Sequence, residues 1–154
     1  MLLPIFQWAD TLWVSELIRA STWAFALLEV FHLFGLTILL GTLAVVNLRL
    51  FGVGLTSPHI RDLADDAKPW MIIGAAVSMS TGFLLFASEA MKCYASGPFF
   101  IKITLLFIAL VFSIAFQTKM TRSDEPSGAS KAGAVVSMAL WFGVGLAGRA
   151  IAFF

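Results

Sequence analysis

Residues 23–48 read WAFALLEVFHLFGLTILLGTLAVVNL, a run interrupted only by Glu29, His32 and Asn47. As a helix the run is long enough to cross the hydrocarbon of a bilayer, and a helix satisfies all of its backbone polar groups internally. Three more stretches pass the same test: residues 69–88, 98–116 and 132–154. The second starts at Pro69, and proline is tolerated in the first turn of a helix. We therefore predict an all-α membrane protein, a bundle of four transmembrane helices that forms a single membrane domain over residues 1–154.

The composition agrees with this class. Of the 154 residues, 60% are hydrophobic and only 12% are charged, whereas a soluble domain carries about 25% charged residues. The net charge of +1 is too small for a nucleic-acid-binding face, so we expect no nucleic-acid partner. Cys93 is the only cysteine, which excludes a disulfide within the chain.

The residues before the first span have a different pattern. Residues 4–20 mix apolar and polar side chains and include Trp8 and Trp13. This mixture is typical of an amphipathic helix that lies in the membrane interface, with its tryptophans at the depth of the headgroups. The N-terminus lacks the basic region and the small-residue cleavage site of a secretory signal, so we expect it to stay on the chain.

The basic residues of the short loops predict the orientation. The first and third loops would share one side of the membrane and contain six basic residues: Arg49, Arg61, Lys68, Lys119, Arg122 and Lys131. The opposite side has at most four: Arg19, Lys92, Lys102 and Arg149. Because cytoplasmic loops are enriched in lysine and arginine, both termini are predicted to lie outside the cytoplasm.

The charges within the spans are predicted to converge on one leaflet. Glu29 and His32 lie early in the first span, Glu89 ends the second, Lys102 begins the third and Arg149 lies near the end of the fourth. Charges at membrane depth are costly, and they usually face a partner, a cofactor or a transport path. Lys102 and Arg149 could instead extend to the headgroups, and Glu29 could pair with either of them. Glu89 follows the small-residue positions Gly74, Ser78 and Gly82, which favour close helix packing.

His32 is the strongest candidate ligand, because it lies too deep and is too short to reach the headgroups. Haem needs one axial imidazole, room for the macrocycle and cations for its propionates. Gly35 would leave room beside His32, and Lys102 and Arg149 would supply the cations.

Copper is the alternative metal for His32. Met79, Met91 or Cys93 could supply soft ligands for it. A third interpretation makes the charges purely structural, with the small residues Ala139, Gly143 and Ala147 forming a face for a homo-oligomer or a partner subunit.

Three segments resemble a known superfamily. Residues 26–35 (ALLEVFHLFG), 47–51 (NLRLF) and 97–106 (GPFFIKITLL) are similar to helices of the HemJ-type protoporphyrinogen oxidases, small haem-b membrane proteins, and the CopD-type copper-resistance domains share a similar helical pattern. The resemblance covers about residues 24 to 116. It implies that His32 is the axial haem ligand and that Lys102 is its functional partner. The tail of the chain differs, so we expect a smaller relative that keeps the haem-binding or metal-handling scaffold.

These observations lead to one preferred hypothesis. The chain would bind haem b through His32, with Lys102 and Glu29 as candidate catalytic residues, and would act in electron transfer or in the oxidation of a small substrate. Its partners would be the lipid bilayer and a quinone or a redox protein, and its location the bacterial inner membrane. A copper or cation transport module and a structural subunit of a membrane complex are the alternatives.

Overall fold

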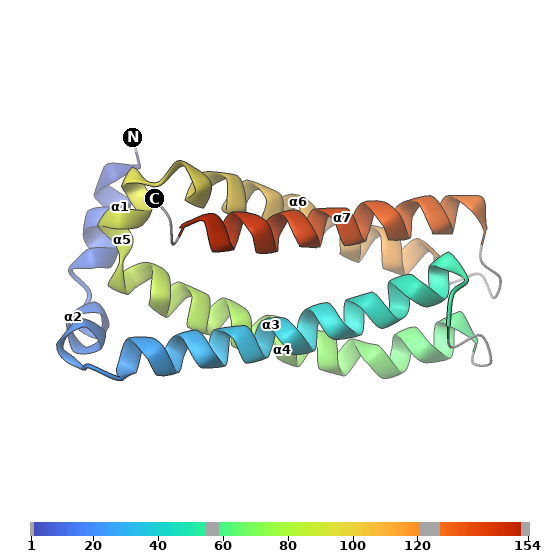
Figure 1. Ribbon diagram of the computed structural model, residues 1–154, viewed down its shortest axis with the longest axis horizontal. Coiled ribbons are helices and arrows are strands. Elements are labelled where there is room, and N and C mark those ends of the chain that lie inside the picture. The colour runs from blue at the N-terminus through green and yellow to red at the C-terminus, as the bar shows by residue number, and fades with distance from the viewer. Residues whose placement is uncertain (1, 55–58, 121–126, 152–154) are drawn as a thin grey trace.

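The computed structural model describes residues 2–54, 59–120 and 127–151. These residues form helices in the order α1 (Leu3–Asp10), α2 (Trp13–Ala20), α3 (Ala24–Phe51), α4 (Ile60–Ser88), α5 (Ala90–Ala95), α6 (Gly97–Met120) and α7 (Gly128–Ala150), and within them there is no strand (Figure 1). In this part of the chain, four helices are long and apolar enough to cross a membrane: α3, α4, α6 and α7. The prediction of an all-α, four-helix membrane bundle is confirmed.

The ends of the long helices follow local signals. Gly52 ends α3 in the left-handed conformation, with φ of 89°, which glycine adopts without strain. Ser127 precedes α7 and forms a capping box with Ser130. The sequence predicts the last span at residues 132–154, whereas α7 begins at Gly128. Residues 152–154 lie outside the described residues.

The second long helix begins earlier than the predicted start at Pro69. Helix α4 runs continuously from Ile60 through Pro69 to Ser88. Proline removes one hydrogen bond inside a helix, here the one to the carbonyl of Asp65. The helix tolerates this loss because residues 61–68 are mostly polar, so that the freed carbonyl lies in the hydrophilic part of the helix.

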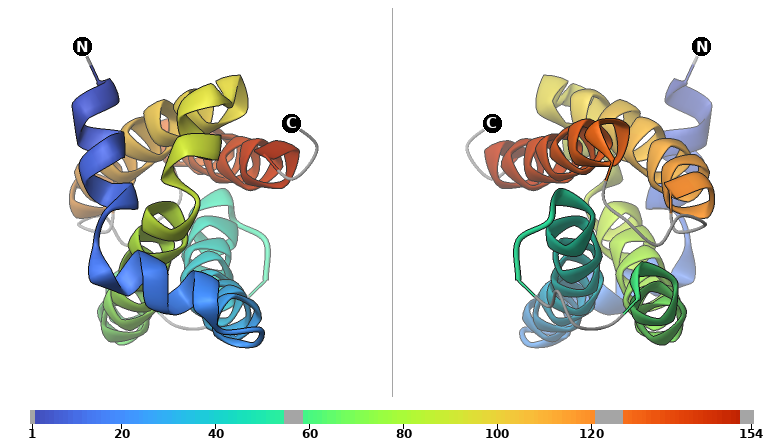
Figure 2. Two further views of the ribbon diagram at one scale, coloured as in Figure 1. Left: turned by 90° about the vertical axis from the view of Figure 1, so that its left-hand side faces the viewer. Right: turned by 90° about the vertical axis from the view of Figure 1, so that its right-hand side faces the viewer.

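The N-terminal segment contains two short helices where the sequence analysis predicts one. Helix α1 ends at Asp10, and Leu12 has an extended backbone before α2 begins. The break is stabilised by Ser15, whose buried Oγ donates to Ala9 O at 2.9 Å. The two helices lie across one end of the bundle (Figure 2, left).

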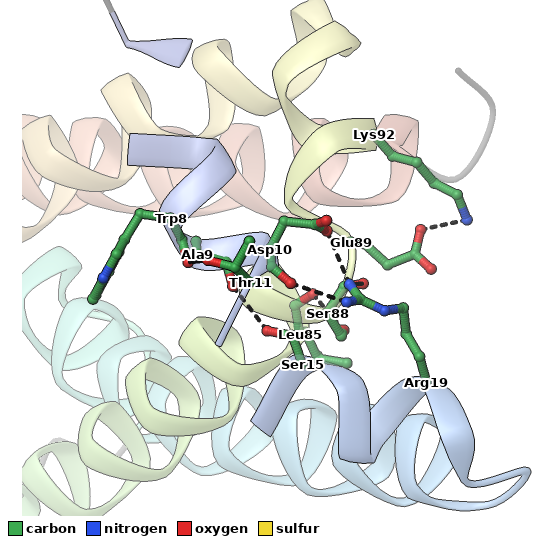
Figure 3. Close-up of polar contacts among 10 residues, drawn as sticks. All are labelled: Trp8, Ala9, Asp10, Thr11, Ser15, Arg19, Leu85, Ser88, Glu89 and Lys92. Carbon is green, nitrogen blue, oxygen red and sulfur yellow. Dashed lines mark hydrogen bonds and ion pairs between the residues drawn. The ribbon is translucent and has the colours of Figure 1, made fainter. Parts of the chain in front are cut away.

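Arg19 fastens these short helices to the bundle. Its Nη1 donates to Asp10 Oδ1 at 2.9 Å and to Ser88 O at 3.2 Å, while Nη2 donates to Asp10 O at 2.9 Å (Figure 3). Phe6 packs edge-on against Phe86 and Phe99, whose rings lie 5.3 and 5.9 Å away. The hydrogen bonds of Arg19 and the aromatic contacts of Phe6 therefore hold the two short helices against this end of the bundle.

The long helices form two antiparallel pairs, α3 with α4 and α6 with α7, and α3 also packs against α7. A central apolar cluster joins the pairs and consists of Leu39, Leu43, Ala109, Trp141 and Val144. This topology places the start of α3, the end of α4, the start of α6 and the end of α7 at the same end of the bundle (Figure 1).

Candidate functional site

His32 on α3 is held by one turn of α4. Its Nδ1 lies 2.9 Å from Ser78 O and 3.1 Å from Thr81 Oγ1. A carbonyl oxygen can only accept, so Nδ1 carries the proton and donates it. The Thr81 hydroxyl donates to Val77 O at 2.6 Å, which leaves its lone pairs free to accept from the same Nδ1–H. In the neutral ring, Nε2 is then the unprotonated nitrogen.

Three glycines bring α3 and α4 close enough for these hydrogen bonds. A Cβ on Gly74 would lie 2.6 Å from Leu39 N, and one on Gly82 would lie 3.0 Å from His32 Cε1. A Cβ on Gly35 would lie 2.8 Å from Ser78 Oγ. The expected open space beside Gly35 is thus filled by Ser78, since Gly35 serves the helix contact. The prediction that Gly74, Ser78 and Gly82 allow close packing is confirmed.

Among the described residues, the charged groups of Lys102 and Glu29 lie near enough to act electrostatically on the His32 imidazole. Lys102 is half-buried on α6 and runs beside Gly148 of α7, where a Cβ would lie 3.5 Å from Nζ. Glu29 is exposed on α3 and forms no ion pair with a residue that the structure describes. The structure thus brings Lys102 and Glu29 to the His32 end without joining them in a salt bridge.

Glu89 and Arg149 lie at the margin of this site. Glu89 pairs with Lys92 of α5 (Figure 3), so the carboxylate is engaged at the end of the bundle instead of pointing toward the helix interior. Arg149 is exposed near the end of α7. Neither residue contacts His32 in any hydrogen bond of the described chain.

Cys93 on α5 is buried in the aromatic end of the bundle, beside Phe6 and Ala90. Burial raises the pKa of its thiol, and the nearby Glu89 carboxylate raises it further, while Lys102 and Lys92 oppose the shift. The reactive thiolate form of Cys93 is therefore disfavoured relative to an exposed cysteine.

The methionines considered as copper ligands lie on the surface of the described bundle. Met79 is 50% exposed, and it lies on α4 one residue away from Ser78, on a different face from the His32 contact. Met91 is also exposed. Within residues 2–54, 59–120 and 127–151, no three His, Cys, Asp or Glu side chains are grouped closely enough to hold a metal ion.

The small residues of α7 pack mainly within the chain. A Cβ on Gly143 would lie 3.5 Å from Leu105 Cδ1 of α6, and Ala147 is buried. Only Ala139 of the three is exposed. Gly143 therefore lies against α6, while the homo-oligomer or partner face at these residues stays a prediction.

Two polar contacts of α3 are not predicted by the sequence analysis. Thr81 was not singled out, although its spacing of three from Ser78 places both residues on one face of a helix. Asn47 is 1% exposed and donates from Nδ2 to Ser137 Oγ at 3.1 Å, which links α3 to α7. Arg49, interpreted from sequence as an orientation signal, is also buried, at 8% exposure.

Fold and site together define an integral membrane protein, a four-helix bundle. Among the described residues it has one intramembrane histidine, which is held by hydrogen bonds near the end covered by α1, α2 and α5. The chain belongs to the family of unknown function DUF6644, whose model matches residues 5–154. No curated protein and no solved structure matches the chain.

Proposed function

We propose that this protein binds haem b through His32 and acts in electron transfer or in the oxidation of a small substrate. The hydrogen bonding of His32 carries the proposal: Nδ1 donates to Ser78 O, so Nε2 keeps its lone pair. Metal-ligating histidines are commonly fixed in this way, because a carbonyl on one nitrogen sets the tautomer and turns the other nitrogen toward the metal. The resemblance of residues 24–116 to haem-b membrane proteins points to the same residue.

The residues around His32 fit haem in ligand type and in charge. One neutral imidazole is enough for axial ligation, and Lys102 is a half-buried cation near the ring that suits a propionate. When bound, haem would supply one-electron redox chemistry. Lys102 would hold a carboxylate or deliver a proton from Nζ, and exposed Glu29 would take up a proton at its carboxylate. Arg149 would add a second cation at the same end of the bundle.

In this proposal the protein lies in the bacterial inner membrane, with both termini outside the cytoplasm. In that orientation His32 and Lys102 belong to the outer half of the membrane. A quinone or a redox protein would exchange electrons with the site there. Thr81 and Ser78 would keep the imidazole orientated, and the Phe6 cluster would restrict water at the end of the bundle.

The test is an oxidised-minus-reduced visible spectrum of the detergent-purified protein, with His32→Ala and His59→Ala alongside. His59 is the matched control, because it is the second of the two histidines and directly precedes α4 at the opposite end. We expect b-type absorption in the wild type and in His59→Ala, and its loss in His32→Ala. A wild type that stays colourless after haem is added would overturn the proposal.

A further inference from the structure

Helix α2 is packed less firmly than α1, although both cover the same end of the bundle (Figure 2, left). In α1, Phe6 and Ala9 belong to the buried aromatic cluster. In α2 only Ser15 and Ile18 are buried, and Ser15 donates its hydrogen bond to α1. Ile18 is therefore the single buried apolar side chain of α2. Segments with so few buried contacts open at a low cost in free energy.

A groove of about 440 Å³ lies between α2 and the membrane-spanning helices. Leu28 of α3 and Leu84 of α4 form part of its wall. Leu28 precedes His32 by four residues and Leu84 follows Thr81 by three, spacings that place each pair on one face of its helix. The wall that α3 and α4 contribute thus lies one helical turn from the contact between His32 and Thr81.

Arg19 supplies the polar contact between α2 and the spans. Among the described residues, the side-chain hydrogen bonds from α2 to another helix are those of Ser15 and Arg19, and of these only the bond from Arg19 to Ser88 O reaches a membrane-spanning helix. The side chains of Arg19 and Asp10 are 39% and 36% exposed, so water competes for their ion pair (Figure 3). The hold on α2 is thus concentrated in one accessible arginine.

We infer that α2 is a movable flap, latched by Arg19, over the surface of α3 and α4 that leads to His32. Helix α1 stays in place on its aromatic cluster. The flap turns about the two breaks that flank it, where Leu12 and Ser21 have extended backbones. When the latch opens, α2 moves off the groove, and the helix faces beside His32 become accessible from the membrane. The inference rests on the proposed function only for what passes the flap, which is haem.

The first test measures the flap by the distance between two spin labels in the detergent-purified protein. The labels are attached at Glu16→Cys on α2 and Leu27→Cys on α3, both exposed, in a Cys93→Ala background. Arg19→Met keeps the length of the side chain and removes its donors, so a population at longer distance should appear. Asp10→Asn keeps both backbone acceptors of Arg19 and should give a smaller population.

Arg61→Met is the matched control, because Arg61 is exposed near the start of α4, at the opposite end of the bundle. Its distance distribution should equal that of the labelled parent. If Arg19→Met gives the same distribution as Arg61→Met, α2 is a fixed part of the bundle and the inference is wrong. Circular dichroism checks that the variants are folded, and if Arg19→Met is not, the comparison of Asp10→Asn with Arg61→Met decides.

The second test examines whether the flap gates His32. Arg19→Met should raise the rates of haem association and dissociation by the same factor, about tenfold for the loss of a charge-assisted hydrogen bond, and leave the Kd unchanged. If both rates equal those of Arg61→Met although the labels separate, α2 does not gate the site and the inference is overturned. A wild type that binds no haem would contradict the proposed function, and the spin-label distances would then decide the flap by themselves.

Discussion

His32 is held by two oxygen atoms of a single helical turn, and this arrangement is the most specific chemical feature of the molecule. Ser78 O accepts a hydrogen bond from Nδ1–H, which fixes the proton on that nitrogen, and Thr81 Oγ1 accepts from the same N–H. A backbone carbonyl cannot be removed by mutation, whereas the Thr81 hydroxyl can. Thr81 is therefore the residue through which the orientation of the imidazole can be tested.

Thr81→Val should weaken haem binding without abolishing it, because Ser78 O still accepts from Nδ1. Loss of such a supporting hydrogen bond lowers metal-site affinity by roughly 10- to 100-fold, and the measurement is a haem titration of the purified protein. Thr104→Val is the matched control, since Thr104 Oγ1 donates to the carbonyl four residues back, as Thr81 Oγ1 does, but on the exposed face of α6. Equal haem affinity of the two variants would contradict the role given to Thr81.

Cys93 offers a pH-dependent test of the closed end of the bundle. Because burial and Glu89 raise the pKa of the thiol, the reactive thiolate is scarcer at a given pH than for an exposed cysteine. Alkylation by iodoacetamide should thus be slow at neutral pH and should accelerate only toward more alkaline pH, as followed by mass spectrometry. Glu89→Gln should shift this profile to lower pH. A profile identical to that of the protein unfolded in detergent would show that Cys93 is not buried as described.

At the scale of helices, the contact between α3 and α4 determines the site. The glycines at 35, 74 and 82 take the place of side chains that would separate the two helices. Close approach then brings Ser78 and Thr81 to His32, so the packing of α3 against α4 also fixes the orientation of the imidazole.

Gly74→Ala should destabilise the bundle by about 1–3 kcal/mol, because its Cβ would lie 2.6 Å from the backbone of Leu39 and the helices must separate. Gly41→Ala, where a Cβ meets nothing within 4 Å, should leave stability unchanged or raise it slightly, because alanine is the better helix former. Unfolding in detergent followed by circular dichroism measures both. If Gly74→Ala proves as stable as Gly41→Ala, the close packing of α3 and α4 is not as described.

The spans could be predicted from sequence because each is a long apolar run, a signal that depends on composition alone. The convergence of His32, Lys102 and Glu29 was also predictable. Successive spans run in opposite directions, so the start of the first span and the start of the third lie at the same end of the bundle. The partners of His32 were not, because they depend on how α4 is rotated about its axis, and an apolar helix gives little indication of rotation. The same ambiguity caused the wrong interpretation of Gly35 as open space, because the Cβ position there lies 2.8 Å from Ser78 Oγ. The helix through Pro69 was missed because a start signal and a tolerated interior proline look alike in sequence.

At the scale of the whole molecule, the two ends of the bundle differ. One end is covered by α1, α2 and α5 (Figures 1 and 2) and has His32 and Lys102 near it, while the other end is formed by the end of α3, the start of α4, the end of α6 and the start of α7. With an even number of spans, both termini belong to the same side of the membrane. The orientation decides whether the covered end faces the cytoplasm or the outside.

The distribution of basic residues predicts that the covered end lies outside the cytoplasm. Alkaline phosphatase fused to the C-terminus should therefore be active, and green fluorescent protein at the same position should not fluoresce. The reciprocal fusions in the loop before Ile60 should behave in the opposite way. An inactive phosphatase with a fluorescent C-terminal fusion would reverse the orientation and move the proposed site to the inner leaflet.

The central claim is that His32 Nε2 ligates haem, and the most direct measurement is chemical rescue of His32→Gly. The purified variant is mixed with haem, and its visible spectrum is recorded with and without added imidazole. We predict no b-type absorption without imidazole and its restoration when imidazole takes the place of the missing side chain. A b-type spectrum in the variant that equals the wild type without imidazole would contradict the claim, because it would assign the haem ligand to another residue.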